Sequence, residues 1–192
     1  MHPDPITEII RQRRSVKPAM MRPDPVPRDT VELLLENASW APTHGLTEPW
    51  HFVVFSGDSR QALATALQTA YRQTTEASQF RPEKHDKLGT SPLQAPTVIA
   101  IVMNRQTACK IPEWEDIAAV ACAIQNLHLT ATALGLGGYW SSPPLVATAP
   151  MNQFLELEPP SRCLGLFYLG WPKEGLTLQS QRTPVAEKTR WI

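Results

Sequence analysis

Cysteine is scarce in this chain, and neither sign of charge is in excess. Only Cys109, Cys122 and Cys163 occur among 192 residues. An odd number at wide spacings argues against a disulfide framework and favours reduced thiols. Lys plus Arg and Asp plus Glu each total 18, so the formal net charge is zero. Because nucleic-acid binders usually carry a marked basic excess, the composition predicts no nucleic-acid partner.

Long hydrophobic runs are missing as well. The most apolar long segment, residues 117–139, is interrupted by Gln125, Asn126 and His128. A membrane-spanning helix needs about 20 predominantly apolar residues, so we predict no membrane partner. The first ten residues, MHPDPITEII, lack the charged-then-apolar order of a secretory signal. Together with the cysteine pattern, this predicts a cytoplasmic location.

Motifs for a metal, a nucleoside triphosphate or a serine nucleophile are also absent. No histidine pairs with another His, Cys or Glu at the spacing of a helical metal site, and no CxxC occurs, so we predict no metal. Neither GxSxG nor a P-loop is present. The glycines of LGLGG, residues 134–138, follow a predicted helix and precede a predicted strand, the reverse of the dinucleotide-binding order. We therefore interpret them as a helix end with close packing.

Proline, by contrast, is abundant, with 19 residues that mark the turns of the chain. Asp4 and Pro5 form a helix start, because aspartate is a good N-cap and proline suits the first helical position. Elsewhere the spacing of apolar residues predicts the elements. Helices are predicted at 5–13, around 31–38 before Pro42, after Asp58, at 115–135 and, weakly, at 151–157; strands are predicted at 50–55, 95–103, 137–142 and 163–170.

Several segments carry further expectations. Strand 50–55 is continuously apolar, so we expect both of its faces to be largely buried. Helix 115–135 is apolar nearly all round, which is typical of a central buried helix. Residues 75–95 are polar and are expected to form an irregular, mobile excursion, and 173–192 to be an extended tail. The length and the lack of any internal boundary predict one domain, 1–192.

Two stretches offer candidate site residues. Arg13, Arg14 and Ser15 supply two guanidinium forks and a hydroxyl, which suit a phosphate dianion. Taken alone, such a cluster is more often a solvated helix end. The stretch APTHGLTEPWHF, residues 41–52, places His44 in a turn before a strand. Alone, it is equally a proline-braced loop.

In combination these stretches resemble the nitroreductase family of FMN oxidoreductases. Two motifs lie in the first half of the chain: RRSV after an amphipathic helix, and the AP loop that leads into PWHF. Two more lie in the second half: an apolar helix that begins with acidic residues and ends in GLG before an aromatic strand, and a late strand that ends in YLGWP. These elements occur in family order and span nearly the whole chain. The short length and the PEWE stretch at 112–115 resemble the compact subgroup of that family.

The resemblance implies an α+β fold with a mixed central sheet flanked by helices. It also implies an intertwined homodimer, with the C-terminal tail of each subunit extending onto its partner and both active sites at the subunit interface. This would explain why residues 173–192 show no pattern of a self-contained core.

The resemblance further implies the residues that contact FMN. Arg13, Arg14 and Ser15 would hold the flavin phosphate, and His44 would lie along the isoalloxazine. The strand after the long helix would present its main chain beside the ring, at Trp140, Ser141 and Ser142. Arg182 in QRTP would complete the phosphate site.

Three positions depart from the family pattern. Glu48 stands where glutamine usually precedes PW, and Trp40 where the compact subgroup often has arginine. Pro143 stands where glycine is common, and it has no backbone N–H to offer the flavin. We expect Arg182 to compensate for the charge that is missing at Trp40.

The implied activity is transfer of hydride from NAD(P)H through flavin N5 to a small electron-poor acceptor, nitroaromatic or quinone-like, by a ping-pong mechanism. No catalytic side chain is predicted, because the flavin carries the chemistry. Two alternatives stay open: a non-catalytic flavin-binding or redox-sensing protein, and an interaction module without a cofactor whose arginines are merely solvated.

Overall fold

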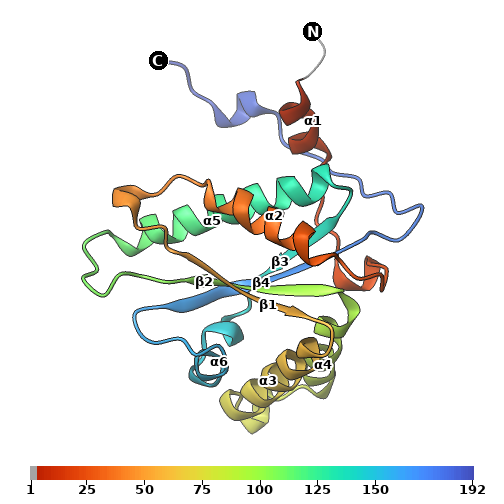
Figure 1. Cartoon of the computed structure of the whole chain (residues 1–192), viewed down its shortest axis with the longest axis vertical. Helices are drawn as coiled ribbons and strands as arrows, with labels where there is room; N and C mark the ends of the chain where they lie inside the picture. The colour runs from red at the N-terminus through yellow and green to blue at the C-terminus, as the bar shows by residue number, and fades with distance from the viewer. Residues whose placement is uncertain (1–3) are drawn as a thin grey trace.

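A four-stranded sheet separates two layers of helices in the computed structural model, which describes residues 4–192. In Figure 1, α2 and α5 cover one face of the sheet, and α3, α4 and α6 cover the other. The helix α1 and the C-terminal segment lie together outside the α2–α5 layer (Figure 1). The α+β class predicted from the sequence is therefore confirmed.

The helices are α1 (Pro5–Gln12), α2 (Arg28–Ser39), α3 (Ser59–Thr74), α4 (Pro82–Gln94), α5 (Glu113–Ala133) and α6 (Ala149–Phe154). The strands are β1 (Trp50–Ser56), β2 (Thr97–Met103), β3 (Gly137–Ser141) and β4 (Arg162–Gly170), and the 3-10 turns are η1 (Pro18–Met20), η2 (His44–Leu46), η3 (Ala77–Gln79), η4 (Pro144–Ala147) and η5 (Val185–Lys188).

The sheet has the order β1-β2-β4-β3, and all three strand pairs are antiparallel. The prediction of a mixed sheet was wrong for these four strands. In residues 4–192 the parallel pairing is limited to an isolated bridge between Ser15 and Gly138. The reason lies in the β1–β2 connection. Two helices, α3 and α4, return the chain to the end where β1 stopped, so that Ser56 pairs with Thr97.

The helix α4 corrects the prediction of an irregular excursion at 75–95. Its proline at N1 suits a helix start, and Pro92 lies near its end. Gly89 allows α4 to approach α3, because a Cβ there would lie 2.5 Å from the Gln68 side chain. Tertiary packing on α3 therefore outweighs the weak helix propensity of this proline- and glycine-containing stretch.

The strand β1 lies at the sheet edge, which corrects the prediction that both its faces are largely buried. Of its seven residues only Phe55 is buried. All seven residues of β2 are buried, because β2 has a neighbour on each side and helices on both faces. An apolar run alone does not distinguish a central strand from an edge strand.

The long helix α5 is buried on one side only. Val120, Ile124 and Leu127 pack into the core, whereas Ala118, Cys122 and Gln125 are exposed in the single chain. The prediction of a helix buried all round is thus met on one face and not on the other. Although α5 is long, no helix of residues 4–192 meets the length and hydropathy that a membrane span requires.

The chain beyond β4 crosses the molecule without joining the sheet. The Lys173 N–H donates to the Met20 carbonyl (2.9 Å), and an isolated bridge joins Met21 to Pro172. After Lys173 the C-terminal segment forms the short turn η5, and residues 179–192 are exposed. The helix α1 buries none of its residues either. Both ends of the described chain therefore leave apolar side chains exposed to solvent in the single subunit.

Candidate functional site

Three guanidinium groups gather where α1 ends. The Arg14 Nε donates to the Leu178 carbonyl (3.1 Å), which ties the C-terminal segment to this turn. Burial, and then the nearby charges of Arg182 and Arg14, lower the pKa of Arg13. The structure thus brings together Arg13, Arg14 and Arg182, which the sequence places far apart. Within residues 4–192 none of the three forms a salt bridge, so an anion would relieve their mutual repulsion.

The predicted serine lies where this turn meets the sheet. Ser15 forms the parallel bridge with Gly138, and the Val16 N–H donates to the Gly138 carbonyl at 2.9 Å. A Cβ on Gly137 would come within 2.6 Å of Val16, and one on Gly138 within 2.2 Å of Phe167. Gly135 has φ +76 at the end of α5. The interpretation of LGLGG as a helix end with close packing is therefore confirmed.

His128 supports this turn, a role that sequence analysis missed. It is buried in α5 with 7% of its surface exposed, and its Nε2 donates to the Arg14 carbonyl at 3.2 Å. Its ring meets Phe167 edge-on, with centroids 5.2 Å apart. Burial, with a contribution from Arg13, lowers the pKa of His128 to about 4. A lone polar residue in an apolar helix was the available signal.

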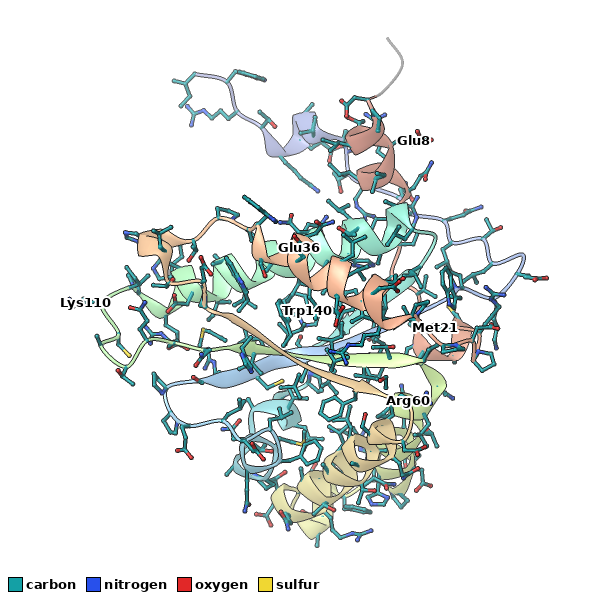
Figure 2. The ribbon with its side chains drawn as sticks, in the orientation of Figure 1. Glu8, Met21, Glu36, Arg60, Lys110 and Trp140 are labelled. Carbon is teal, nitrogen blue, oxygen red and sulfur yellow. The ribbon has the colours of Figure 1, made fainter. Side chains whose placement is uncertain are left out.

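The strand β3 extends from Ser15 toward the other predicted main-chain positions. Trp140 is 37% exposed (Figure 2), and Ser142 follows the strand and is exposed. Ser141 and Pro143 line a cavity of about 510 Å³ at that end of β3. Lys17, two residues after Ser15, lines the same cavity and was not predicted from the sequence.

His44 lies at the opposite end of α5. Its Nδ1 donates to Glu115 Oε2 at 2.5 Å, and its side chain is largely exposed. The turn around it is strained, because Leu46 and Glu48 have φ values of 54° and 42° in the left-handed region. Glu48 is exposed, and Trp40, at the end of α2, is 81% exposed.

A buried ion pair fastens this strained turn to α5. The Arg105 Nε donates to Asp116 Oδ2 at 2.9 Å, and both side chains are almost fully buried. The Thr47 hydroxyl reaches the other carboxylate oxygen of Asp116 at 3.4 Å and lies 2.8 Å from the Thr43 hydroxyl. The Thr43 hydroxyl in turn accepts the Glu48 N–H at 3.2 Å. We call this chain of contacts the Asp116 network.

Within one chain, His44 and the arginines do not meet. His44 binds Glu115 in the first turn of α5, whereas the arginine turn is bound by His128 near the end of that helix. Thirteen residues separate Glu115 from His128, which is about 20 Å along the axis at 1.5 Å per residue. The predicted site residues therefore form two halves at opposite ends of α5.

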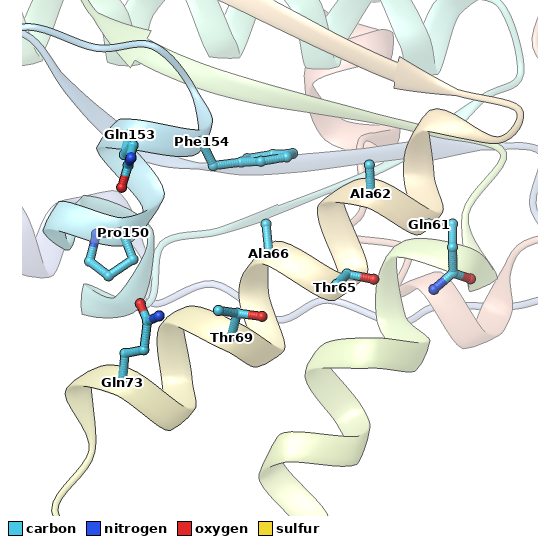
Figure 3. A pocket seen from close by; sticks show the side chains of 9 residues that line it. All are labelled: Gln61, Ala62, Thr65, Ala66, Thr69, Gln73, Pro150, Gln153 and Phe154. Atoms are coloured by element: carbon cyan, nitrogen blue, oxygen red, sulfur yellow. The ribbon is translucent and has the colours of Figure 1, made fainter.

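A second hollow, of about 500 Å³, lies between α3 and α6 (Figure 3). Threonine hydroxyls, glutamine amides and apolar groups line it, and no charged side chain does. It therefore lacks the titratable or cationic groups that would bind a charged cofactor.

Comparison with known proteins places this geometry in a family. The family model described as "Nitroreductase family" matches residues 10–171. The chain belongs to the nitroreductase family. The match begins just before the arginine turn and ends at the residue after β4, so it covers all four strands.

Similar relatives span most of the chain. A protein of Escherichia coli K12, provisionally named NAD(P)H nitroreductase YdjA, is 28% identical over 167 residues, which are 86% of this chain and 87% of that one. A 5,6-dimethylbenzimidazole synthase of Rhodospirillum rubrum is 30% identical over 191 residues, covering 89% and 83%. A nitroreductase-like structure from Bacillus cereus has a TM-score of 0.83 at 28% identity, covering 100% and 98%. Because the two named activities differ, these relatives establish the family but not the acceptor.

Proposed function

We propose that the protein is an FMN-dependent oxidoreductase that takes hydride from NAD(P)H and passes it to a small electron-poor acceptor, nitroaromatic or quinone-like. The observation that carries this proposal is the cluster of Arg13, Arg14 and Arg182, which has no salt-bridge partner among residues 4–192, in a chain of the nitroreductase family. A relative from Desulfovibrio desulfuricans, 25% identical with a TM-score of 0.75, is described as a complex with FMN. Three unpaired cysteines suit a reducing compartment, so we propose a cytoplasmic location.

The residues present fit the phosphate of FMN. A phosphate dianion accepts several charge-assisted hydrogen bonds, and three guanidiniums with the Ser15 hydroxyl supply such donors. From Ser15, β3 leads to Ser141 and Ser142, whose main chain would flank the ring. Pro143 has no N–H, so any main-chain donor to the ring comes from Ser142 or an earlier residue.

The protein's share of the mechanism is to bind, orient and exclude water. When bound, FMN supplies the hydride chemistry at N5. His128 stays neutral above its low pKa, so it holds the Arg14 carbonyl without adding charge to the phosphate site. The Asp116 network holds the turn that carries His44. A single pocket beside the bound flavin would serve donor and acceptor in turn, so we expect ping-pong turnover.

We also propose that the active unit is a homodimer in which the two halves of the site come from different subunits. If the α5 helices of two subunits pack antiparallel about a two-fold axis, Glu115 of one helix lies opposite His128 of the other. The partner's His44 then reaches the arginine cluster. This arrangement covers the exposed face of α5, and its axis passes halfway between Glu115 and His128, near Cys122.

The tail beyond Trp171 completes the proposed dimer. Val185, Trp191 and Ile192 are 77%, 92% and 112% exposed in the single chain, which is unfavourable for large apolar side chains. Packing of these side chains on the partner removes that exposure. We retain one domain, residues 1–192, whose tail, 173–192, passes the arginine turn of its own chain and then packs its last residues on the partner.

Steady-state kinetics test the proposed reaction. Double-reciprocal plots against NAD(P)H at several concentrations of a quinone acceptor should be parallel, and mass spectrometry of the released ligand should give FMN. Intersecting lines would indicate a ternary complex. A protein that binds flavin but reduces no acceptor would support the redox-sensing alternative, and one without flavin would support the interaction module.

A further inference from the structure

The helices α3 and α4 pack side by side on one face of the sheet (Figure 1), and different side chains hold the two ends of α4. Its C-terminal end is held by Arg60, which is labelled in Figure 2. The Arg60 Nη1 donates to the Leu93 carbonyl at 3.2 Å and to the Ala95 carbonyl at 2.6 Å. Because an arginine keeps its charge in proteins, these bonds do not respond to pH.

The N-terminal half of α4, residues 82–88, is held through His85. The His85 side chain is 14% exposed and faces α3, where Arg72 Nη2 lies 3.0 Å from His85 Nε2. Since a guanidinium can only donate, this bond requires a neutral ring that accepts at Nε2 and carries its proton on Nδ1. Asp86 Oδ1 lies 3.4 Å from Nδ1 and can accept the hydrogen bond of that proton.

The charges around the His85 ring come from both helices. Arg72 approaches from α3, whereas Asp86 and Lys84 are neighbours on α4 itself. The Lys84 Nζ lies over the Tyr71 ring, 4.8 Å from its centroid. The Asp86 side chain is 77% exposed, so its attraction to the ring is weakened by water. The nearest charge that faces the ring is therefore the positive charge of Arg72.

Uncharged groups complete the packing around this ring. The Gln68 Nε2 lies 3.4 Å from Nδ1 and donates to the His85 carbonyl at 3.2 Å. Phe80, in the segment before α4, packs on the His85 ring with centroids 5.6 Å apart. The Tyr71 hydroxyl accepts the Arg81 N–H at 3.1 Å. These contacts hold the start of α4 on α3, but none of them compensates a charge on the ring.

Histidine is the side chain whose charge ordinarily changes between pH 5 and 8. A second proton on His85 would replace the accepting lone pair at Nε2 by an N–H that points at the Arg72 guanidinium. The hydrogen bond is then lost, and two positive charges remain in contact. We propose that the Arg72–His85 contact is a pH-sensitive clamp, which holds the N-terminal half of α4 on α3 while the ring is neutral and releases it when the ring is protonated.

The half of α4 that the clamp holds is also a wall of the cavity at the end of β3. Lys84 and Leu88 line that cavity opposite the strand that carries Ser141. Because Arg60 still holds the other end, release lets α4 move about its C-terminal end and widens the entrance to the cavity. This role in access rests on the proposed function, which places the flavin ring beside Ser141, whereas the clamp itself does not.

Hydrogen–deuterium exchange of the flavin-loaded protein at pH 7 and pH 5 tests the clamp without turnover. Rates are corrected for the intrinsic exchange rate of each amide at each pH. The amides of residues 82–88 should then exchange about three- to tenfold faster at pH 5, as expected when one partly exposed contact turns into a repulsion. Unchanged corrected exchange of these amides in the wild type would overturn the clamp.

His85→Gln and Arg72→Gln separate the clamp from other titrations. Glutamine does not titrate, so in His85→Gln the corrected exchange of 82–88 should differ less than about twofold between the two pH values. Arg72→Gln removes the opposing charge and should reduce the response to the same extent. His51→Gln is the matched control, because it removes an exposed histidine from β1 and should respond as the wild type does. The effect of His128 on global stability is common to all four proteins.

A wild-type response in His85→Gln would show that another group titrates and would overturn the clamp. The role in access is tested by the rates at which a bulky and a small quinone reoxidise the flavin. The ratio of the bulky to the small quinone's rate should rise from pH 7 to pH 5 in the wild type and not in His85→Gln. An unchanged ratio in the wild type would overturn the role in access.

Reduction of the flavin by NAD(P)H on the same samples separates this inference from the proposed function. A reducible flavin in a protein whose α4 does not respond to pH would overturn the inference alone. A pH-responsive α4 in a protein whose flavin neither nucleotide reduces would support the clamp and overturn the function, and the role in access with it.

Discussion

Individual residues set the charge of the proposed phosphate site. Arg13 and Arg14 belong to one turn, but Arg182 reaches it only because the tail folds back past Arg14. The Arg182 side chain also bonds the Gln181 carbonyl at 2.9 Å and the Ser180 hydroxyl. These local bonds orient the guanidinium without neutralising it. Trp40, which ends α2 and is 81% exposed, adds no charge.

Arg182→Ala should weaken FMN binding by roughly ten- to a hundredfold. A charge-assisted hydrogen bond contributes about 1.5–3 kcal/mol, and each 1.4 kcal/mol is tenfold. Titration of the apo-protein with FMN measures the change. Arg190→Ala removes a charge from the same exposed tail and should have little effect. Unchanged affinity in the Arg182 variant would leave the phosphate to Arg13, Arg14 and Ser15.

His128 should make the free energy of unfolding depend on pH. Its pKa is about 4 in the folded protein and 6.5 for the free side chain, so the unfolded state binds the proton more readily. Its contribution is complete above pH 6.5 and is lost progressively as the pH falls from 6.5 toward 4. Between pH 7 and pH 5 the loss should be about 2 kcal/mol at most.

Urea unfolding of wild type and His128→Gln at the two pH values isolates this contribution. Glutamine can retain a donor near the position of Nε2 but does not titrate, so the variant should lose less stability between pH 7 and pH 5. An equal loss in both proteins would show that His128 is not the titrating group.

At the scale of elements, the Asp116 network determines the shape of the turn that carries His44. Asp116→Asn removes the negative charge and leaves Arg105 buried against the Ile111 carbonyl, at 2.6 Å. Because both side chains are shielded from water, leaving Arg105 without its partner is unfavourable. We expect a clear loss of stability, together with weaker FMN binding.

An exposed ion pair provides the comparison for that variant. Arg28 and Glu32 lie on the surface of α2, 2.7 Å apart, and Arg28→Gln should leave the stability almost unchanged. Chemical denaturation and FMN titration of both variants measure the two effects. If Asp116→Asn lost stability without weakening FMN binding, the network would support the fold and not the site.

Sequence patterns predicted some elements well and others poorly. The α1 start was correct because Asp4 and Pro5 act locally, and the Asp4 carboxylate accepts the Thr7 N–H at 3.0 Å. The helix α4 was missed because it depends on packing against α3 through Gly89. The edge position of β1 was missed because pairing partners are not encoded in an apolar run. Because α4 was not predicted, the antiparallel pairing of β1 with β2 could not be predicted either.

The candidate site shows the same division between local and long-range information. Residues 13–15 could be identified because they are adjacent in the sequence, and they follow α1 as expected, whereas their role at the cofactor stays a prediction. Lys84 and Lys87, which line the cavity at the end of β3 together with Ser141, were missed because their segment was expected to be irregular. The support from His128 was missed because its contact with Arg14 spans 114 positions of the chain.

At the scale of the whole molecule, the proposed site is complete only with a partner subunit, because its two halves lie at opposite ends of α5. Light scattering of the flavin-loaded protein should give the mass of a dimer. The proposed axis passes near Cys122, which is exposed on α5. Because that interface brings the two Cys122 thiols together and shields them from bulky reagents, mild oxidation should join two chains through a disulfide between them.

The other exposed thiol, Cys109, lies in the segment before α5 and supplies the control. Cys109→Ser should still cross-link, and Cys122→Ser should not. A flavin-loaded monomer would contradict the shared site. A dimer that cross-links only through Cys109 would place the two-fold axis elsewhere on the molecule.

The central claim is that electrons pass from NAD(P)H to an acceptor through bound FMN, and anaerobic double-mixing stopped flow tests it most directly. The first mix, with NADH or NADPH, should bleach the visible absorbance of the oxidised flavin in a single turnover. The second mix, with a quinone or nitroaromatic acceptor, should restore it. A flavin that neither nucleotide bleaches, or that stays reduced after the acceptor is added, would contradict the account.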